Sequence, residues 1–286
     1  MWTAMRIAAS TYLNSAPLVY GFASGSQRHR VRFLGDTAPS RCAQMLAAAQ
    51  CDVALIPVIE SQRIPNLRLI PGTAVASKQR VRSVVLAARV PPEEARTVTL
   101  DTSSRTSQAL VKILFAERWH SGPQFIERTP DVNFDCENML EASDGALVIG
   151  DPTFRLHERA EMLGVRIYDL AEEWRAMTGL PFVFAVWAAR QEVCEDGRIT
   201  GVDFIAAKNE GLLHLEEIAQ EYACSLNLPL SLTLSYLRDN VNFELDEENL
   251  AGMRRYFALA HKHGLIETLR EPEFVGSESV GVSWSQ

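Results

Sequence analysis

Residues 6–19, Arg-Ile-Ala-Ala-Ser-Thr-Tyr-Leu-Asn-Ser-Ala-Pro-Leu-Val, contain the pattern that decides the fold. Their first part, residues 6–10, predicts a buried strand, and Ser15 with Pro17 is typical of a helix start. The same order of strand and helix continues through residues 31–57, where Pro39 opens the next predicted helix. Strands and helices that alternate in this way predict a mostly parallel sheet with helices on both faces.

Two longer apolar runs, residues 83–88 and 181–189, flank a second set of predicted strands and helices. We therefore expect two α/β lobes joined by two hinge strands, with a ligand cleft between the lobes. The first lobe would comprise residues 1–88 and 190–286, and the second would be inserted at 89–189. The alternative is one continuous doubly wound sheet.

Composition narrows the class of protein. Among 286 residues, 36 acidic residues outweigh 28 basic ones, which gives a net charge of −8 and argues against nucleic acid as a partner. The longest apolar run, residues 181–189, is too short for a membrane helix. The N-terminal residues lack the pattern of a secretion signal, and the cysteines are scattered without a C-x-x-C pair. These features predict a cytoplasmic protein that binds no membrane.

The loop after the first predicted strand, residues 10–17, carries hydroxyl groups and the Asn14 amide. In open α/β sheets, ligand loops lie at the carboxyl ends of strands. The hydroxyls, the amide and the N–H groups of the following helix together suit a carboxylate. A polar cap that serves only the helix is an equally good interpretation.

Residues 101–107, Asp-Thr-Ser-Ser-Arg-Thr-Ser, also lie between a predicted strand and a predicted helix. Their hydroxyls, with Arg105 among them, favour an anion site at a helix N-terminus. The segment lacks the glycines and the lysine of a phosphate loop, so nucleotide binding is not expected. A plain capping turn remains the alternative.

A third strand-end loop, residues 147–152, contains Gly150, which allows a ligand to approach the backbone closely. Asp151 would either hold the hinge or face the cleft, and a simple turn before a helix is an equal alternative. Phe182, at the start of the second apolar run, is expected to form an apolar wall of the cleft.

The sequence contains no motif that indicates a metal site or a catalytic triad. No H-E-x-x-H or G-x-S-x-G motif is present, and His261 and His263 are spaced so that they do not share a helix face. We therefore expect no metal site and no catalytic triad. The polar groups are mainly hydroxyls, an amide and helix termini, which suit a small anion.

Five segments in the same order resemble the chorismate dehydratase family of the futalosine route to menaquinone. They are residues 10–18 (STYLNSAPL), 52–57 (DVALIP), 83–86 (SVVL), 102–107 (TSSRTS) and 178–185 (TGLPFVFA). One departure is visible: the family usually has Ser-Tyr-Leu-Asn, whereas Thr11 here separates Ser10 from Tyr12. Thr11 is therefore expected to supply that hydroxyl, and an individual role for Ser10 is in doubt.

The resemblance implies a type II periplasmic-binding-protein-like fold and the conversion of chorismate to 3-[(1-carboxyvinyl)oxy]benzoate and water. It also implies that the reaction needs neither a metal nor an organic cofactor. Asn14 and Ser83 would be catalytic, with Thr11 assisting, while Thr106 and Ser107 would bind a carboxylate. In the absence of an evident side-chain base, the enolpyruvyl carboxylate of the substrate would take the proton. Further substrate-binding residues are expected to be Tyr12, Pro57, Ser103, Gly150, Asp151 and Phe182.

Three alternatives remain at this point. The first is the sibling enzyme 1,4-dihydroxy-6-naphthoate synthase, which shares the fold but has a different first motif. The second is a solute-binding protein that captures a small anion without chemistry, since the fold alone does not decide function. The third is a ligand-sensing regulatory domain, which the acidic composition disfavours. Either a monomer or a homodimer is compatible with the sequence.

Overall fold

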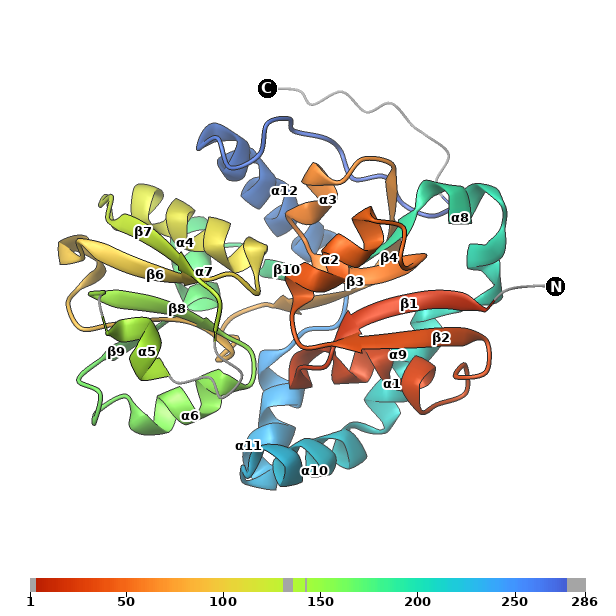
Figure 1. Cartoon of the computed structure of the whole chain (residues 1–286), viewed down its shortest axis with the longest axis horizontal. Helices are drawn as coiled ribbons and strands as arrows, with labels where there is room; N and C mark the ends of the chain where they lie inside the picture. Colours follow the sequence, from red (N-terminus) through yellow and green to blue (C-terminus); the bar gives the residue numbers. More distant parts are fainter. Residues whose placement is uncertain (1–3, 131–135, 142, 277–286) are drawn as a thin grey trace.

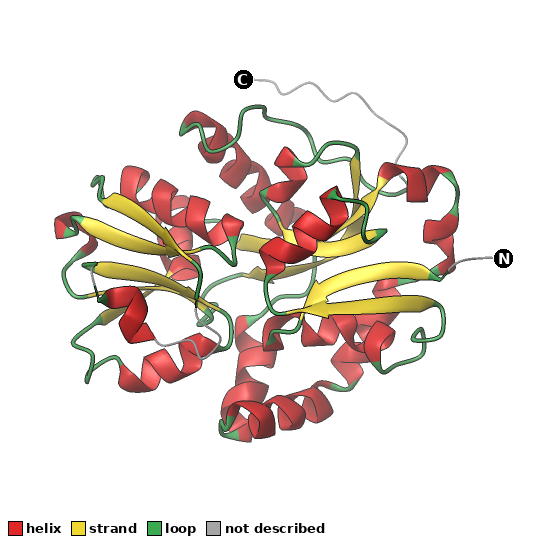
Figure 2. Cartoon of the chain, viewed as in Figure 1, coloured by secondary structure: helices red, strands yellow, loops and turns green. Residues whose placement is uncertain are grey.

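The computed structural model describes residues 4–130, 136–141 and 143–276. Within these ranges, the helices are too short or too polar to cross a bilayer. Two separate sheets divide the chain into two lobes, which lie side by side in Figure 1 and Figure 2.

The sheet of the first lobe grows from the strands that the N-terminal pattern predicts. β1 (Met5–Ser10) pairs in parallel with β2 (Val31–Asp36) and β3 (Val53–Pro57). β10 (Phe182–Arg190) pairs antiparallel with both β3 and β4 (Leu67–Ser77), which completes the order β2-β1-β3-β10-β4. The predicted parallel arrangement is therefore confirmed, with β10 as the strand that runs the other way.

The second sheet has the same plan. β6 (Thr97–Asp101) pairs in parallel with β7 (Gln124–Arg128) and β8 (Gly145–Ile149). β5 (Val84–Ala88) runs antiparallel between β8 and β9 (Arg166–Asp169), so the order is β7-β6-β8-β5-β9. β8 is buried throughout, as expected for a strand with helices on both faces.

Helices cover both faces of each sheet (Figure 1). In the first lobe α2 packs on β1 and β3, while α1 packs on α9, which contacts β4. In the second lobe α4 and α7 pack on one another, and α5 and α6 contact β8. The helices that precede β10 are η1 (Leu13–Ser15), α1 (Ala16–Ala23), α2 (Pro39–Ala47), α3 (Glu60–Arg63), η2 (Pro92–Glu94), α4 (Arg105–Glu117), α5 (Cys136–Leu140), α6 (Pro152–Arg159) and α7 (Leu170–Thr178).

The chain after β10 is helical, as its sequence predicts. Its longest helix, α12 (Glu247–Lys262), begins where Asp246 accepts a hydrogen bond from the Asn249 N–H at 2.9 Å, which confirms the predicted cap. The other elements are α8 (Gln191–Glu195), η3 (Arg198–Gly201), α9 (Phe204–Leu213), α10 (Leu215–Leu226), α11 (Leu230–Ser235) and the π-helix η4 (Tyr236–Asn240).

The chain passes between the lobes twice, and the strand pairing shows that neither crossing lies at the expected boundary, 88/89 or 189/190. β5 belongs to the second sheet and β10 to the first, so the chain crosses at residues 78–83 and 179–181. An apolar run is equally suited to either sheet, and the strands that pair with it decide which one it joins. The outermost residues of the expected first lobe, 1–3 and 277–286, lie outside the described ranges.

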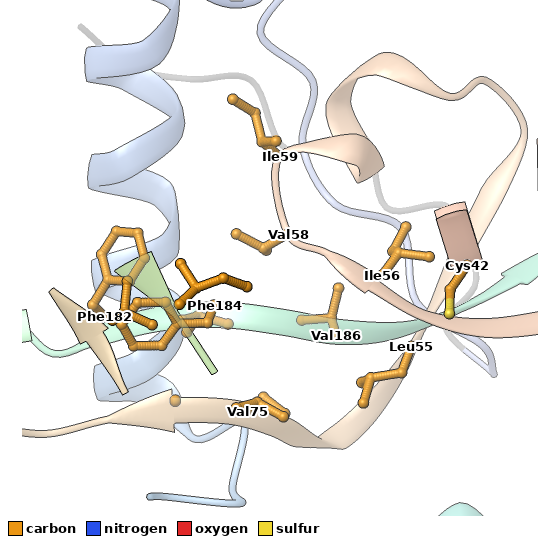
Figure 3. Packing of buried hydrophobic residues seen from close by; sticks show 14 of the residues in the cluster. Cys42, Leu55, Ile56, Val58, Ile59, Val75, Phe182, Phe184 and Val186 are labelled. Carbon is orange, nitrogen blue, oxygen red and sulfur yellow. The ribbon is translucent and has the colours of Figure 1, made fainter. Parts of the chain in front are cut away.

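An aromatic cluster packs at the second crossing, at the junction of the lobes. Phe182 contacts Trp174 of α7 and Tyr256 of α12, with ring centroids 5.3 and 5.0 Å apart. Figure 3 shows Phe182 and Phe184 beside Val75, within an apolar core that continues through both lobes. The Trp174 indole N–H donates to the Pro181 carbonyl at 3.0 Å, which anchors the crossing segment.

Candidate functional site

A cavity lies where the carboxyl ends of the parallel strands of both lobes meet. Its walls come from β1 and the following loop, from β3, β4 and β10, and from the ends of β8 and the start of α4. The lining residues are Ser10, Tyr12, Asn14, Ser15, Pro39, Leu55, Pro57, Val75, Val84, Ser104, Ser107, Ile149, Gly150, Phe184 and Ala185.

A second, larger hollow lies away from the junction, between α3, the start of β4 and the segment after α12. Its lining residues include Gln62, Asn66, Gln191 and Arg270. It receives no strand-end loop from the second lobe. The interlobe cavity is therefore the candidate site, since ligands of open α/β sheets bind at the carboxyl ends of the strands.

The loop after β1 supplies the polar wall of the first lobe. The Ser15 hydroxyl donates to the carbonyls of Ser10 at 2.7 Å and Tyr12 at 2.9 Å, so it stabilises the turn η1. This turn places Tyr12 and Asn14 at the cavity. Ser10, whose role the sequence left in doubt, also lines the cavity.

The start of α4 supplies the polar wall of the second lobe. Ser104 caps the helix by accepting from the Ser107 N–H, and the two hydroxyl oxygens lie 2.9 Å apart. Both hydroxyls line the cavity at the positive end of the helix dipole. This arrangement can bind a carboxylate through neutral donors.

Gly150 and Tyr12 meet across the two lobes. Gly150 has a φ of +73°, and a Cβ at this position would lie 2.8 Å from the Tyr12 ring. The Gly150 N–H donates to the Ser83 carbonyl at 2.7 Å. The close approach expected at Gly150 is therefore made by the Tyr12 ring, which closes this side of the cavity.

Asp151 connects the lobes instead of lining the cavity. Its carboxylate accepts the Leu13 N–H at 3.0 Å, and burial raises the pKa of Asp151 to about 7. Asp101, at the end of β6, is also buried, which raises its pKa to about 6, although hydrogen bonds from Ser103 oppose this shift. Asp151 was expected either to hold the hinge or to face the cleft. Its bond to Leu13 instead joins the two lobes outside the crossing segments 78–83 and 179–181.

Several other predicted residues contact protein groups. Thr106 accepts the Ile59 N–H at 3.3 Å through its hydroxyl, and Ser103 donates to Asp101. Arg105 pairs with Glu60 of α3 at 2.8 Å, across the lobes. Thr11 is exposed, and its hydroxyl donates to the Asp36 carbonyl at 3.2 Å. None of these four predicted residues belongs to the lining set.

The apolar wall is formed by Phe184 instead of Phe182. Phe182 is buried in the aromatic cluster, whereas Phe184 and Ala185 both line the cavity. The register of β10 against β4 shifts between Val183 and Ala185, as in a β-bulge. Because a bulge interrupts the alternation of side chains along a strand, two consecutive residues can face one side.

Ser83 and a residue that the sequence analysis missed, Tyr236, lie behind the cavity wall. Tyr236 is fully buried, and its hydroxyl donates to the Ser83 hydroxyl oxygen at 2.7 Å. The Asn14 side chain also acts on this phenol, whose pKa it lowers against the larger effect of burial. Nothing in the sequence pattern around Tyr236 indicates a functional role, because the pattern is that of an ordinary core residue in a C-terminal helix.

The chemistry of the cavity follows from its lining. Apolar side chains and prolines form most of the surface, and the polar groups are hydroxyls, one amide and a helix N-terminus. Within the described residues, no three His, Cys, Asp or Glu side chains converge as metal ligands. The arrangement can hold a small, partly apolar anion away from water.

Comparison with known proteins identifies the family. A family profile described as menaquinone biosynthesis matches residues 5–262. The chain belongs to this family. The match includes both lobes and all the described C-terminal helices.

Two proteins with significant sequence similarity to this chain are chorismate dehydratases. The protein of Thermus thermophilus is 29% identical over 263 residues, which cover 86% of this chain and 91% of the relative. The protein of Campylobacter jejuni is 27% identical over 181 residues, which cover 63% and 61% of the two chains.

Solved structures establish the fold of this menaquinone biosynthesis family member. A protein of Archaeoglobus fulgidus superposes with a TM-score of 0.73 at 17% identity, covering 92% of this chain and 98% of its own. The alkanesulfonate-binding protein SsuA of Xanthomonas axonopodis, bound to MOPS, gives 0.68 at 14% identity, covering 96% and 97%. The expected type II periplasmic-binding-protein fold is confirmed.

Proposed function

We propose that this chain is a chorismate dehydratase, which converts chorismate to 3-[(1-carboxyvinyl)oxy]benzoate and water. The observation that supports this most directly is the interlobe cavity, with apolar walls and neutral donors from both lobes. The similarity to the Thermus and Campylobacter chorismate dehydratases supports the same reaction.

The cavity suits a ring that carries two carboxylates. Ser104 and Ser107 at the start of α4 bind one carboxylate, because their hydroxyls and the helix N-terminus favour negative charge. Phe184, Leu55 and Val75 line the space for the ring. The residues proposed from the sequence that line this space are Tyr12, Asn14, Pro57, Ser107 and Gly150.

The reaction removes a ring hydroxyl and a neighbouring ring proton. The electrons of the C–H bond form the new ring double bond, the C–O bond breaks, and the departing hydroxide leaves as water. Asn14 orients the reacting part of the ring. The enolpyruvyl carboxylate accepts the ring proton and passes it to the departing hydroxide, which gives water and regenerates the carboxylate. The product is aromatic, so orientation and exclusion of water are the main tasks of the protein.

The roles of the residues behind the lining follow from their contacts. Ser83 acts next to Asn14 through the shared Tyr236 hydroxyl. Asp151, Thr106 and Arg105 hold the lobes together around the substrate through the interlobe contacts described above.

The test is incubation of the purified protein with chorismate, followed by detection of the aromatic product by absorbance and mass spectrometry. We expect turnover by the wild type and a loss of at least about tenfold in Asn14→Ala, with binding retained. Asn209→Ala, at an exposed position of α9, is the matched control.

Three outcomes separate the alternatives. Chorismate returned unchanged from a tight complex would indicate a solute-binding protein. Neither binding nor turnover of chorismate would favour the 1,4-dihydroxy-6-naphthoate synthase branch. Full turnover by Asn14→Ala would remove Asn14 from the mechanism while leaving the reaction assigned.

A further inference from the structure

Tyr236 lies at the junction of three parts of the chain that are far apart in sequence. It opens the short π-helix η4, and single π-helical turns are frequent at functional sites. Its ring packs edge-on against Phe154 of α6, with centroids 5.0 Å apart at 85°. Tyr236 therefore connects the C-terminal helices of the first lobe to the second lobe, directly behind the candidate site.

The hydrogen bond of Tyr236 fixes the direction of the Ser83 hydroxyl. A phenol has one proton, and Tyr236 donates it to the Ser83 hydroxyl oxygen at 2.7 Å. Ser83 therefore keeps its own proton to donate. The Asn14 side chain acts on the same phenol and lowers its pKa, as expected of an amide N–H directed toward the phenol oxygen.

The backbone around Ser83 adds a further restraint. The Ser83 carbonyl accepts the Gly150 N–H at 2.7 Å, and Gly150 lies under the Tyr12 ring. Val84, the next residue, lines the cavity. A change at the Tyr236 hydroxyl therefore reaches the reacting side of the cavity through Ser83 and Asn14.

Tyr236 is not suited to exchange a proton itself. Burial raises its pKa far above the ordinary value for tyrosine, and the nearby Asp151 adds to the shift. The phenol therefore keeps its proton over the working range of pH, and its hydrogen-bond directions do not change.

We propose that Tyr236 is a positioning residue for the dehydration, whose hydroxyl orients the Ser83 hydroxyl and the Asn14 amide from behind the cavity wall. This inference rests on the proposed function, because it concerns the same reaction. It assigns a role in that reaction to the C-terminal helices, which carry Tyr236.

The test compares two tyrosines that each lose one buried hydroxyl. Tyr236→Phe removes the bond to Ser83, and the control Tyr256→Phe removes a bond from an equally buried hydroxyl to the Thr106 carbonyl at 3.0 Å. We expect similar decreases in Tm, because each variant loses one buried hydrogen bond. For Tyr236→Phe we expect kcat to fall by about 10- to 100-fold with KM changed less than about threefold. For Tyr256→Phe we expect kcat within about twofold of the wild type.

A double-mutant cycle then distinguishes positioning from a structural role. If Tyr236 acts through Ser83, its effect on kcat in a Ser83→Ala background should shrink by at least about threefold. A purely structural tyrosine would give the same factor in both backgrounds.

The results separate this inference from the function on which it rests. An active wild type in which Tyr236→Phe behaves like Tyr256→Phe, or in which the two effects are additive, overturns the inference alone. A wild type that leaves chorismate unchanged overturns the proposed function, and the inference with it.

Discussion

Gly150→Ala tests whether the lobes close around the cavity as the structure shows. The added methyl would lie 2.8 Å from Cζ of Tyr12 and 2.9 Å from Cε1 and Cε2. Carbon atoms normally approach only to about 3.5–4.0 Å. Because Tyr12 and Gly150 belong to different lobes, the methyl must displace the ring or hold the lobes apart.

The energetic cost of Gly150→Ala has two parts, and each part is detected by a different measurement. A left-handed backbone conformation costs alanine about 1–2 kcal/mol, which lowers the free energy of unfolding. Overpacking against the ring adds about 1–3 kcal/mol, which destabilises the closed arrangement of the lobes. Since each 1.4 kcal/mol corresponds to about a tenfold change, kcat/KM for chorismate should fall tenfold or more.

The assay is urea unfolding together with steady-state kinetics on the wild type, Gly150→Ala and Gly197→Ala. Gly197 has a φ of +77°, and a Cβ there would meet open space. The control Gly197→Ala is therefore destabilised by the backbone conformation alone, without a contact to a ring. We expect both variants to lose stability and only Gly150→Ala to lose kcat/KM. Equal losses of stability and unchanged kcat/KM in both variants would refute the argument from the ring contact.

Three further predictions concern the contacts around the site. Burial raises the pKa of Asp151 from 3.8 to about 7, so the folded state binds more protons than the unfolded state between these values, and stability should fall as pH rises from about 4 to 7. Asp151→Asn should flatten this part of the profile in urea unfolding, and an unchanged slope would contradict it. Glu60→Gln weakens the bonds to Arg63 at 2.9 Å and to Arg105 at 2.8 Å; because both arginines are partly exposed, we expect a loss of about 1 kcal/mol and a higher KM. A KM equal to that of the wild type would show that this bridge does not contribute to closure. Asp246→Ala removes the cap of α12 and should lower the free energy of unfolding by about 1 kcal/mol without a change in kcat, whereas an unaltered midpoint would rule out the cap as a stabilising contact.

Local rules predicted much of the fold because they act over a few residues. The apolar run at residue 6, the helix start at Pro39 and the cap at Asp246 each appear where their patterns indicate. The crossings were misplaced because β5 satisfies its hydrogen bonds with β8 and β9, which come later in the chain. Such pairing cannot be read from an apolar run alone.

Within the hydroxyl-rich segment at the start of α4, helix geometry selects the residues that face the cavity. Ser104 and Ser107 are three apart and share one side, whereas Thr106 is turned toward Ile59. Similarly, the bulge in β10 brings Phe184 to the cavity and leaves Phe182 in the aromatic cluster. Residue type indicated which segments form the site, but not which of their side chains face it.

By itself, the sequence determined the order of strands and helices, the three strand-end loops and the polar groups available to a ligand, because periodicity, caps and residue chemistry are local. The tertiary structure decided which sheet each apolar run joins, which hydroxyls face the cavity, and that Tyr236 meets Ser83 and Asn14. The physical reason is that these contacts join residues far apart in the chain, and they form only when both lobes pack around the same crossing.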